Sequence, residues 1–322
     1  MTIGKHRTKQ GTGDTSMADP PSGGIRGDGR VLLSGARGML GSVLGPYLSS
    51  KGYDVRGFDL DSGDICDVQW LEQVFSDWKP DIFCNCAAYT RVDDAERNQE
   101  AAFRVNGEAL AGIAALCEAK GAVLVHFSTD YVFDGCKRTP YVETDEPNPL
   151  SVYGKSKWEG EQHILDRGKG CTRSFIIRTS WLYGRHGANF ITTLLDLAEK
   201  KAGISVVHDQ KGTPTLCRDL SEAVFQLLRS GAFGVYHFSG EGSCTWYELA
   251  RASIELAERR GFIPKTRDIT PITTKEFNRP APRPSFSVLD KTRYKDATGA
   301  PVPHWLDSLE NFIFSALRLA ET

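Results

Sequence analysis

The sequence contains no apolar run long enough to cross a membrane: the longest runs, such as residues 122–127, have the length of a β-strand. Nothing in it resembles the apolar region of a secretion signal. The formal net charge of −2 gives no electrostatic reason to expect a nucleic-acid partner. We therefore expect a cytoplasmic protein whose partners are neither membranes nor nucleic acids.

The eight cysteines are not spaced as a disulfide framework or as a zinc site. Cys84 and Cys86 alternate along a predicted strand, where reduced cysteines serve as small apolar side chains. Histidines at positions 126, 163, 186, 208 and 237 are scattered without metal-ligand spacing. We therefore predict no metal site.

A short apolar strand pattern at 30–34 leads into a turn with Gly35, Gly38 and Gly41, and an amphipathic helix is predicted over 39–50. In a strand–turn–helix unit, the first glycine permits the turn, the second lets a pyrophosphate approach the backbone and the third allows close packing. The helix N-terminus adds amide donors for an anion. The pattern predicts dinucleotide binding by the segment from Gly35 through Met39 and Leu40 to Gly41; a purely structural turn is the alternative.

Two charged residues argue in opposite directions about the preferred nicotinamide cofactor. Asp59 follows the predicted strand 53–58, where a carboxylate holds the ribose hydroxyls and favours NAD. Arg37, inside the glycine turn, can pair with a 2′-phosphate and favours NADP. The residues leave this preference open.

Further residues complete the expected cofactor site. Asp64 and Ile65 are candidates for contact with adenine. Ala87 and Ala88 end a predicted buried strand over 81–88, where small side chains leave room for a cofactor across the strand end.

Tyr153 and Lys157 are four residues apart, which places both on one face of a predicted helix. A nearby ammonium group stabilises phenolate and lowers the pKa of a tyrosine from about 10, so the pair can protonate a carbonyl during its reduction. A buried strand over 122–128 brings Thr129 and Asp130 to the sheet edge where ligands bind. An exposed helix and a simple turn are the alternatives for these two segments.

The order of strand and helix patterns from residue 30 to about 180 predicts a doubly wound parallel sheet of the Rossmann type, with helices on both faces. We expect this part to bind NAD(P). Residues 1–29, rich in Gly, Ser, Thr, Pro and charge, predict a flexible tail. Residues 181–322 predict a smaller C-terminal α/β lobe that mainly binds substrate, with some interleaving. Its expected helices cover 190–201, 219–229 and 247–260, and its expected strands cover 205–207 and 235–238.

Taken in order, these residues resemble the extended short-chain dehydrogenase/reductase superfamily. Further motifs are similar to those of dTDP-4-dehydrorhamnose reductases and extend the resemblance from residue 30 to the C-terminus. These motifs are Ser128-Thr-Asp-Tyr-Val-Phe-Asp-Gly135, Pro149-Leu-Ser-Val-Tyr-Gly-Lys-Ser-Lys157, Arg178-Thr-Ser-Trp-Leu-Tyr-Gly184, Asp209-Gln-Lys-Gly-Thr-Pro-Thr215 and Arg279-Pro-Ala-Pro-Arg-Pro284.

The resemblance implies reduction of the C4 ketone of dTDP-4-dehydro-β-L-rhamnose by NADPH, with NADH as the alternative cofactor. It implies that Tyr153 protonates the forming C4 alkoxide and that Lys157 holds the nicotinamide ribose and lowers the pKa of Tyr153. Thr129 would orient the proton transfer. Asn106, on a helix predicted over 100–120, would support the region of the catalytic helix. An interior polar residue bonded to backbone is its alternative.

The resemblance also implies a set of substrate contacts. Asp130 would bond the sugar, Trp181 would form an apolar wall beside it, and Arg283 would bind the diphosphate. A surface arginine in a proline-rich loop is the alternative for Arg283. Asn189–Phe190 and Gln210 are weaker candidates near the nucleotide.

Two positions depart from patterns known in related enzymes. Some family members bind Mg²⁺ between subunits through a glutamate on the helix after the glycine turn, where this chain has Val43. A homodimer formed by another interface stays open. Sugar-nucleotide 4,6-dehydratases add an Asp-Glu pair after the catalytic threonine, whereas Asp130 is followed here by Tyr131.

Three alternatives share most of these residues. A 4-epimerase would retain its cofactor and need no external reductant. A reductase of another dTDP-4-keto or branched sugar, such as one forming dihydrostreptose, would use the same groups for hydride transfer. A non-catalytic protein similar to the regulatory subunit of methionine adenosyltransferase would have the same fold; the segment 178–184, which includes Trp181, favours a reductase.

Overall fold

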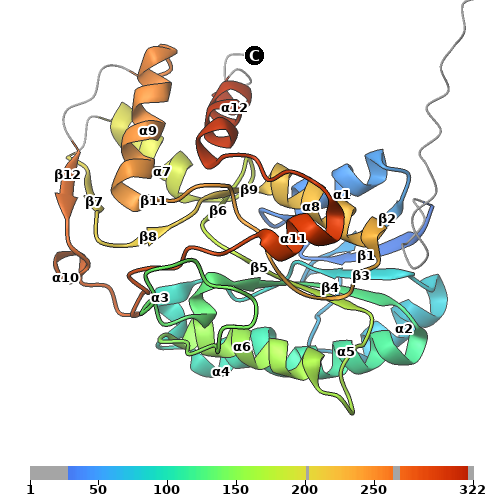
Figure 1. The fold of residues 1–322 in the computed structure, drawn as a ribbon. Coiled ribbons are helices and arrows are strands. Elements are labelled where there is room, and N and C mark those ends of the chain that lie inside the picture. The colour runs from blue at the N-terminus through green and yellow to red at the C-terminus, as the bar shows by residue number, and fades with distance from the viewer. Residues whose placement is uncertain (1–27, 201–202, 264–268, 318–322) are drawn as a thin grey trace, which may run out of the picture.

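A six-stranded parallel sheet forms the centre of the molecule, in the strand order β2–β1–β3–β4–β5–β10. The computed structural model describes residues 28–200, 203–263 and 269–317 (Figure 1). Most of the tail expected at 1–29 therefore lies outside the described residues. The six strands are β1 (Arg30–Ser34), β2 (Asp54–Phe58), β3 (Ile82–Asn85), β4 (Val123–Thr129), β5 (Ser174–Thr179) and β10 (Gly234–His237).

Helices cover both faces of this sheet, as Figure 1 shows. The central strands β3, β4 and β5 are buried along their whole length, as expected where helices pack on both faces. The expected doubly wound parallel α/β fold is confirmed. One face carries α1 (Gly41–Ser50), α8 (Cys217–Ser230) and α11 (Thr292–Thr298), and the other carries α2 (Val68–Trp78), α5 (Ala109–Lys120) and α6 (Val152–Leu165).

Three expected elements differ from the observed ones. The strand expected at 235–238 in the smaller lobe is β10, which pairs with β5 in the central sheet. The helix expected from residue 39 begins at Gly41, because Met39 and Leu40 belong to the turn before it. The helix expected over 100–120 is divided into α4 (Gln99–Phe103), the π-helical segment η1 (Arg104–Glu108) and α5.

The π-helical segment carries a buried asparagine that joins it to two other parts of the chain. Its buried Asn106 exchanges hydrogen bonds with the backbone of Tyr89, accepting at 2.8 Å and donating at 3.0 Å. Asn106 also donates to the hydroxyl of Ser156 on α6, at 3.0 Å. Asn106 is therefore an interior polar residue bonded to backbone, and it also contacts the helix α6. Insertions of this kind in helices are frequent at functional sites.

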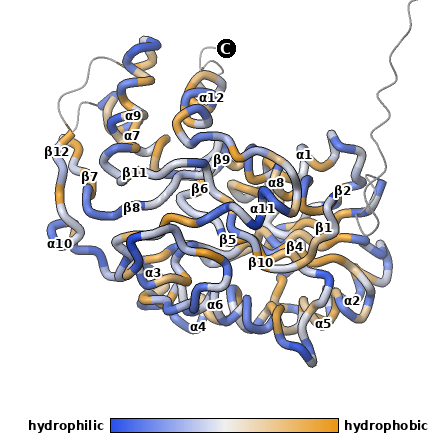
Figure 2. The backbone as a smooth tube through the Cα atoms, viewed as in Figure 1, coloured by the Kyte–Doolittle hydropathy of each residue, from blue (hydrophilic) through white to orange (hydrophobic). Residues whose placement is uncertain are grey.

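The second lobe encloses a core of its own between helices and short strand pairs. The outer helices α9 and α12 alternate between hydrophilic and hydrophobic residues along the tube in Figure 2, as expected for helices with one buried face. Its elements include α7 (Phe190–Glu199), α9 (Trp246–Arg259), α12 (Trp305–Leu317), β7 (Ser205–Val207) with β12 (Thr270–Ile272), and β8 (Lys211–Gly212) with β11 (Cys244–Thr245).

The remaining elements of the described residues are short. They are α3 (Val92–Ala95), the 3₁₀ turn η2 (Asp130–Val132), the pair β6 (Leu182–Tyr183) and β9 (Thr215–Leu216), and α10 (Thr274–Phe277). Across the described ranges, no helix has both the length and the apolar character needed to cross a membrane.

Candidate active site

The carboxyl ends of β1, β3 and β4 bring together the segments that carry the expected cofactor and proton-transfer residues. Parallel strands all present this end to the same edge, where open α/β sheets bind ligands. The glycine turn follows β1, Ala87 and Ala88 follow β3, and Thr129 and Asp130 end β4. Residues spread over about a hundred positions of sequence thus meet at one edge.

The glycine turn is packed too closely for other residues at two positions. Gly35 has φ +64°, and a Cβ there would lie 2.9 Å from the backbone nitrogen of Ala87. A Cβ on Gly41 would lie 2.1 Å from the carbonyl oxygen of Gly35, so only glycine lets α1 begin this close to the strand end. At Gly38 the corresponding distance to the same oxygen is 3.1 Å. This cradle fits the backbone approach that a dinucleotide pyrophosphate requires.

Arg37 is held by two carboxylates. Its Nε lies 3.1 Å from Asp59 Oδ2, and its terminal nitrogen Nη2 lies 2.7 Å from Asp61 Oδ1. The backbone N–H of Arg37 also donates to Asp59. Hydrogen bonding and charge at Asp61, followed by the charge of Asp59, raise the pKa of Arg37. The two residues that argued in opposite directions about the cofactor are thus bound to each other, and sequence reasoning did not find Asp61.

The candidates for adenine contact have partners within the protein. Asp64 forms an ion pair with Arg104, at 3.1 Å, and accepts a hydrogen bond from the backbone of Cys66. Ile65 is buried in the core between α2 and the sheet. Ala87 donates its N–H to Ser34 at 3.4 Å, which holds the end of β3 beside the glycine turn.

Helix α6 begins at Val152, one residue before Tyr153. Its N-cap Ser151 accepts a hydrogen bond from the N–H of Gly154, which fixes the first turn. The Tyr153 ring packs edge-on against Tyr131, with ring centroids 5.9 Å apart. Burial raises the pKa of Tyr153 to about 12, while a hydrogen bond with the Thr129 side chain acts in the opposite direction.

Lys157 is buried, with 2% of its surface exposed. Burial lowers its pKa to about 8, and the Glu161 carboxylate acts against that change. Its Nζ lies 3.2 Å from Nε2 of His126 on β4. Burial, followed by the charge of Lys157, holds the pKa of His126 well below its ordinary value, so this ring is neutral. This contact of His126 was not found from sequence, because nothing in its local pattern indicates a contact with residue 157.

Thr129 and Asp130 lie where β4 enters η2. Thr129 Oγ1 accepts from the N–H of Tyr131 and donates to Asp130 Oδ1, both at 3.1 Å. Asp130 is 2% exposed, and burial raises its pKa to about 7 although hydrogen bonds with Ser287 and Thr129 act against this. Within the described part of the chain, Asp130 Oδ2 has no hydrogen-bond partner of normal geometry. A buried carboxylate oxygen in that state suits a ligand hydroxyl.

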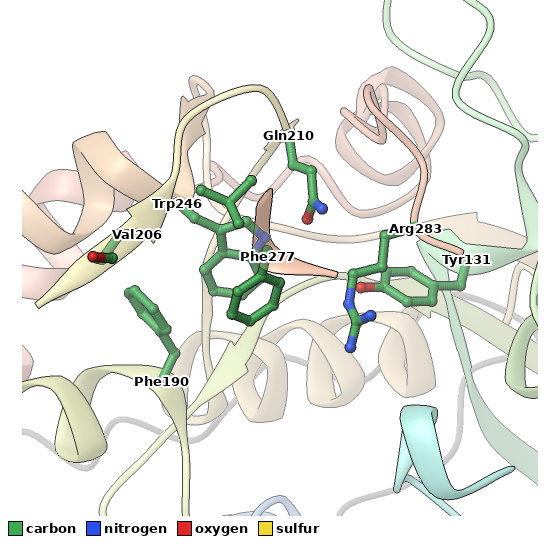
Figure 3. A pocket seen from close by; sticks show the side chains of 9 residues that line it. Tyr131, Phe190, Val206, Gln210, Trp246, Phe277 and Arg283 are labelled. Atoms are coloured by element: carbon green, nitrogen blue, oxygen red, sulfur yellow. The ribbon is translucent and has the colours of Figure 1, made fainter. Parts of the chain in front are cut away.

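An aromatic cavity of about 180 Å³ lies next to this group of residues. Tyr131, whose ring contacts Tyr153, forms part of the cavity wall and so joins the two regions. Figure 3 shows Arg283 beside Tyr131, and Phe277, Trp246 and Phe190 grouped toward the other side. The complete lining is Tyr131, Phe190, Ser205, Val206, Val207, Gln210, Trp246, Phe277 and Arg283. Apolar walls with a few polar groups are typical of small-molecule sites.

Trp181 supports this cavity through a neighbour. Its ring stacks on Trp246, with centroids 3.7 Å apart and planes 12° from parallel. Its backbone has φ +47°, a conformation that L-residues seldom adopt and that surrounding packing must maintain. Gly212 leaves the room for this ring, since a Cβ there would lie 2.7 Å from it.

Arg283 lines the cavity and also joins its own loop to α3. Its Nη2 lies 3.0 Å from Asp93 Oδ2 on α3, and its Nη1 donates to the carbonyl of Ala281 at 2.9 Å. Of the weaker candidates, Phe190 and Gln210 line the cavity, whereas Asn189 caps α7 by accepting from Thr192. Tyr131, Trp246 and Phe277 were not found from sequence; Tyr131 adjoins Asp130, but the other two carried no signal.

Val43, at the position of the family glutamate, is half-buried and packs against the core between α1 and the sheet. In the three described ranges, no group of three or more His, Cys, Asp or Glu side chains is placed to hold a metal ion.

Comparison with known proteins identifies the family. A model described as the RmlD substrate binding domain matches residues 29–317. The chain belongs to the RmlD substrate-binding domain family. A relative in this family, the dTDP-4-dehydrorhamnose reductase of Aggregatibacter actinomycetemcomitans, is 36% identical over 88% of this chain and 97% of the relative. The dTDP-4-keto-6-deoxy-D-glucose reductase of Streptomyces niveus is 38% identical over 87% of this chain and 95% of its own.

Solved structures agree with the family assignment. The crystal structure of dTDP-4-dehydrorhamnose reductase from Bacillus anthracis in complex with NADP matches with a TM-score of 0.84 and 35% identity. That match covers 89% of this RmlD-family chain and 99% of the Bacillus chain.

Proposed function

We propose that this protein is an NADPH-dependent oxidoreductase that reduces the C4 ketone of dTDP-4-dehydro-β-L-rhamnose to give dTDP-L-rhamnose. The observation that carries the proposal is the position of Tyr153. Through the Tyr131 ring it adjoins the aromatic cavity, while Lys157, one helical turn away, contacts His126 on β4, which is linked through Asn85 to Ser34, the residue before the glycine turn. A proton donor between a cofactor cradle and a cavity is the arrangement that carbonyl reduction requires.

In this proposal the nicotinamide, when bound, supplies the hydride that forms the new C–H bond at C4. Tyr153 gives its phenolic proton to the C4 oxygen, which converts the ketone to an alcohol. Thr129 orients the Tyr153 hydroxyl, and Lys157 holds the nicotinamide ribose and favours phenolate after the proton has left. The raised pKa of Tyr153 suits a group that must be protonated when hydride arrives.

The cofactor contacts proposed for this chain are those of the glycine turn and its surroundings. The backbone at Gly35, Gly38, Met39, Leu40 and Gly41 would receive the pyrophosphate. Arg37 and Asp59 would contact the adenosine ribose, and Asp64 and Ile65 would lie near adenine. Ala87 and Ala88 would border the nicotinamide half. NADH is the alternative cofactor.

We expect polar side chains to contact the sugar and the diphosphate of the substrate, and the aromatic cavity to hold its thymine base. Asp130 would accept a hydrogen bond from a sugar hydroxyl, since its Oδ2 is buried without a partner among the described residues. Trp181 would shape the sugar site, indirectly through Trp246. Arg283 would exchange part of its contact with Asp93 for phosphate oxygens.

In this proposal residues 30–180 bind the cofactor and residues 181–322 mainly bind the substrate. The protein acts in the cytoplasm. The partner is a dTDP-sugar. Strand β10 and helix α8 come after residue 180 but pack in the first part, so the two parts interleave.

The test supplies the purified protein with dTDP-4-dehydro-β-L-rhamnose and follows nicotinamide oxidation with NADPH and with NADH. We expect dTDP-L-rhamnose as product. The Tyr153→Phe protein should lose at least about a hundredfold in kcat and keep its NADPH affinity, because it lacks only the transferable proton. Turnover by Tyr153→Phe close to that of the unsubstituted protein would contradict the assigned proton donor.

A second substrate is the main alternative, and one comparison favours it. The Streptomyces niveus relative, similar at 38% identity, is named as a reductase of dTDP-4-keto-6-deoxy-D-glucose. Parallel assays with both keto-sugars compare the two values of kcat/KM and decide between them. Binding of NADPH without turnover of either sugar would move the proposal toward the non-catalytic alternative.

A further inference from the structure

His126 links the proposed catalytic lysine to the central sheet. Strand β4 and helix α6 face each other through two matched pairs of buried residues. His126 Nε2 lies 3.2 Å from Lys157 Nζ, and two residues further along β4 the hydroxyl of Ser128 donates to Glu161, one helical turn beyond Lys157. The pairs fix how far Lys157 extends along the sheet.

The other ring nitrogen of His126 continues the contacts across the sheet. Nδ1 lies 3.3 Å from the side-chain amide nitrogen of Asn85 on β3, and the Asn85 oxygen accepts from Ser34 on β1 at 2.7 Å. His126, Asn85 and Ser34 are each no more than 1% exposed. Ser34 directly precedes Gly35. A buried chain of polar side chains therefore runs from Lys157 over three neighbouring strands to the start of the glycine turn.

The amide of Asn85 can present either its nitrogen or its oxygen to the ring, because rotation by 180° exchanges them. When the nitrogen faces Nδ1, the ring hydrogen lies on Nε2 and is donated to a neutral Lys157 amine. When the oxygen faces Nδ1, the ring hydrogen moves to Nδ1, and Nε2 accepts from a Lys157 ammonium. The orientation of one amide is thus linked to the charge of the lysine.

The other charged groups around Lys157 are already engaged. On its own helix, Glu161 is bound by Arg178 of β5, with the closest nitrogen and oxygen 2.7 Å apart, and by Ser128. Cys86, after β3, has its pKa raised by burial and is neutral. Among the described residues, His126 is therefore the group within hydrogen-bond distance of Nζ that remains to stabilise it.

We propose that His126 and Asn85 are positioning residues for Lys157, which hold its Nζ beside the cofactor cleft and satisfy its hydrogen bonds in both charge states. This inference rests on the proposed reductase function, in which Lys157 acts as an ammonium that binds the nicotinamide ribose. The ammonium form is present below the pKa of Lys157 and is lost as the pH rises through that value. Removing the acceptor at His126 destabilises the ammonium and moves this loss to lower pH.

The test compares His126→Phe, which keeps a ring but no hydrogen bond, with His126→Gln, whose amide can face Nζ as donor or acceptor. The Lys157 titration is followed by NMR with ¹³C at the lysine side-chain carbon next to Nζ, and its signal is identified by its loss in Lys157→Arg. The pH dependence of NADPH affinity is measured by tryptophan fluorescence. We expect His126→Phe to lower the midpoint of both curves by about 1 in pH, and His126→Gln to restore most of it.

The matched control is His237→Phe. His237 is also fully buried, but its ring contacts the carbonyl of Tyr141 and Arg178. We expect this control to lose stability and keep the Lys157 titration of the unsubstituted protein. If His126→Phe does not fold, Asn85→Ala tests the same chain, with a smaller change in the same direction.

A Lys157 midpoint that is unchanged in His126→Phe, or that moves equally in His237→Phe, overturns the inference. An unchanged midpoint of the Lys157 titration in Asn85→Ala also overturns the inference. Neither measurement uses a sugar nucleotide. If the protein binds NADPH and shows the expected titrations but reduces no keto-sugar, the proposed function fails and the inference about Lys157 stands.

Discussion

At the residue scale, we propose that the cofactor preference depends on the Arg37 guanidinium, which is shared between two carboxylates. Asp59 holds both the backbone and the side chain of Arg37, and Asp61 binds its outer nitrogen. A 2′-phosphate would have to draw Arg37 away from these carboxylates and would then lie close to their negative charge. A 2′-hydroxyl would instead donate to Asp59 without moving Arg37. The arrangement is suited to binding both cofactors. Asp61 limits how much the 2′-phosphate can increase the affinity for NADPH.

We therefore predict that Asp61→Asn shifts the preference severalfold toward NADPH, because one competitor for Arg37 loses its charge. Arg37→Ala should shift it the other way. The measurement is the affinity for NADPH and for NADH by tryptophan fluorescence, repeated at two ionic strengths because exposed charges are screened by salt. Equal ratios in Asp61→Asn and the unsubstituted protein would contradict this role for Asp61.

At the element scale, the start of α1 shows how a glycine joins a helix to a strand end. The helix begins at Gly41, and the Gly35 carbonyl occupies the space in which a Cβ of residue 41 would lie. The clash is with backbone, which cannot rotate away as a side chain does. The close approach of α1 also places the helix N-terminus at the proposed pyrophosphate position.

We predict that Gly41→Ala lowers the free energy of unfolding by about 1–3 kcal/mol or more and weakens NADPH binding, because the turn must open. Gly203→Ala is the control, since a Cβ there has no neighbour within 4 Å in the described part of the chain. Urea unfolding and cofactor titration check both variants. If Gly41→Ala matched Gly203→Ala in both measurements, the packing argument would be wrong.

At the scale of the whole molecule, one loop ties the two parts together beside the cavity. Asp93 on α3 binds Arg283 and also accepts the N–H of Ala281 at 3.2 Å. The proline-rich character of residues 279–284 keeps this loop from forming a helix, so side chains and backbone ends must anchor it. The anchor connects residues 190 positions apart.

We predict that Asp93→Asn raises the KM for the dTDP-sugar severalfold, because Arg283 is no longer held at the cavity, and leaves NADPH affinity unchanged. Steady-state kinetics with varied sugar nucleotide, together with cofactor titration, check this. A change in NADPH affinity without a change in KM would show that α3 acts on the cofactor side instead.

Much of the fold was predictable because its signals are local. The strands are short apolar runs, the turn after β1 needs glycines, and α6 has Ser151 as an N-cap before Tyr153 and Lys157. Errors arose where distant contacts overrode local pattern. The sequence of β10 is that of any short strand, and only its pairing with β5 places it in the central sheet. The π-helical segment forms where Asn106 contacts Tyr89 and Ser156.

Residues close together along the chain were enough to predict the parallel α/β fold, the glycine turn and the placement of Tyr153 and Lys157 on one helix. The groups that surround these two side chains depend on tertiary packing. Asp61 on Arg37, His126 on Lys157 and the cavity of Tyr131, Phe190 and Trp246 each join segments that are far apart or separately unremarkable in sequence. Such contacts depend on the packing of whole elements, and no local pattern of residues encodes them.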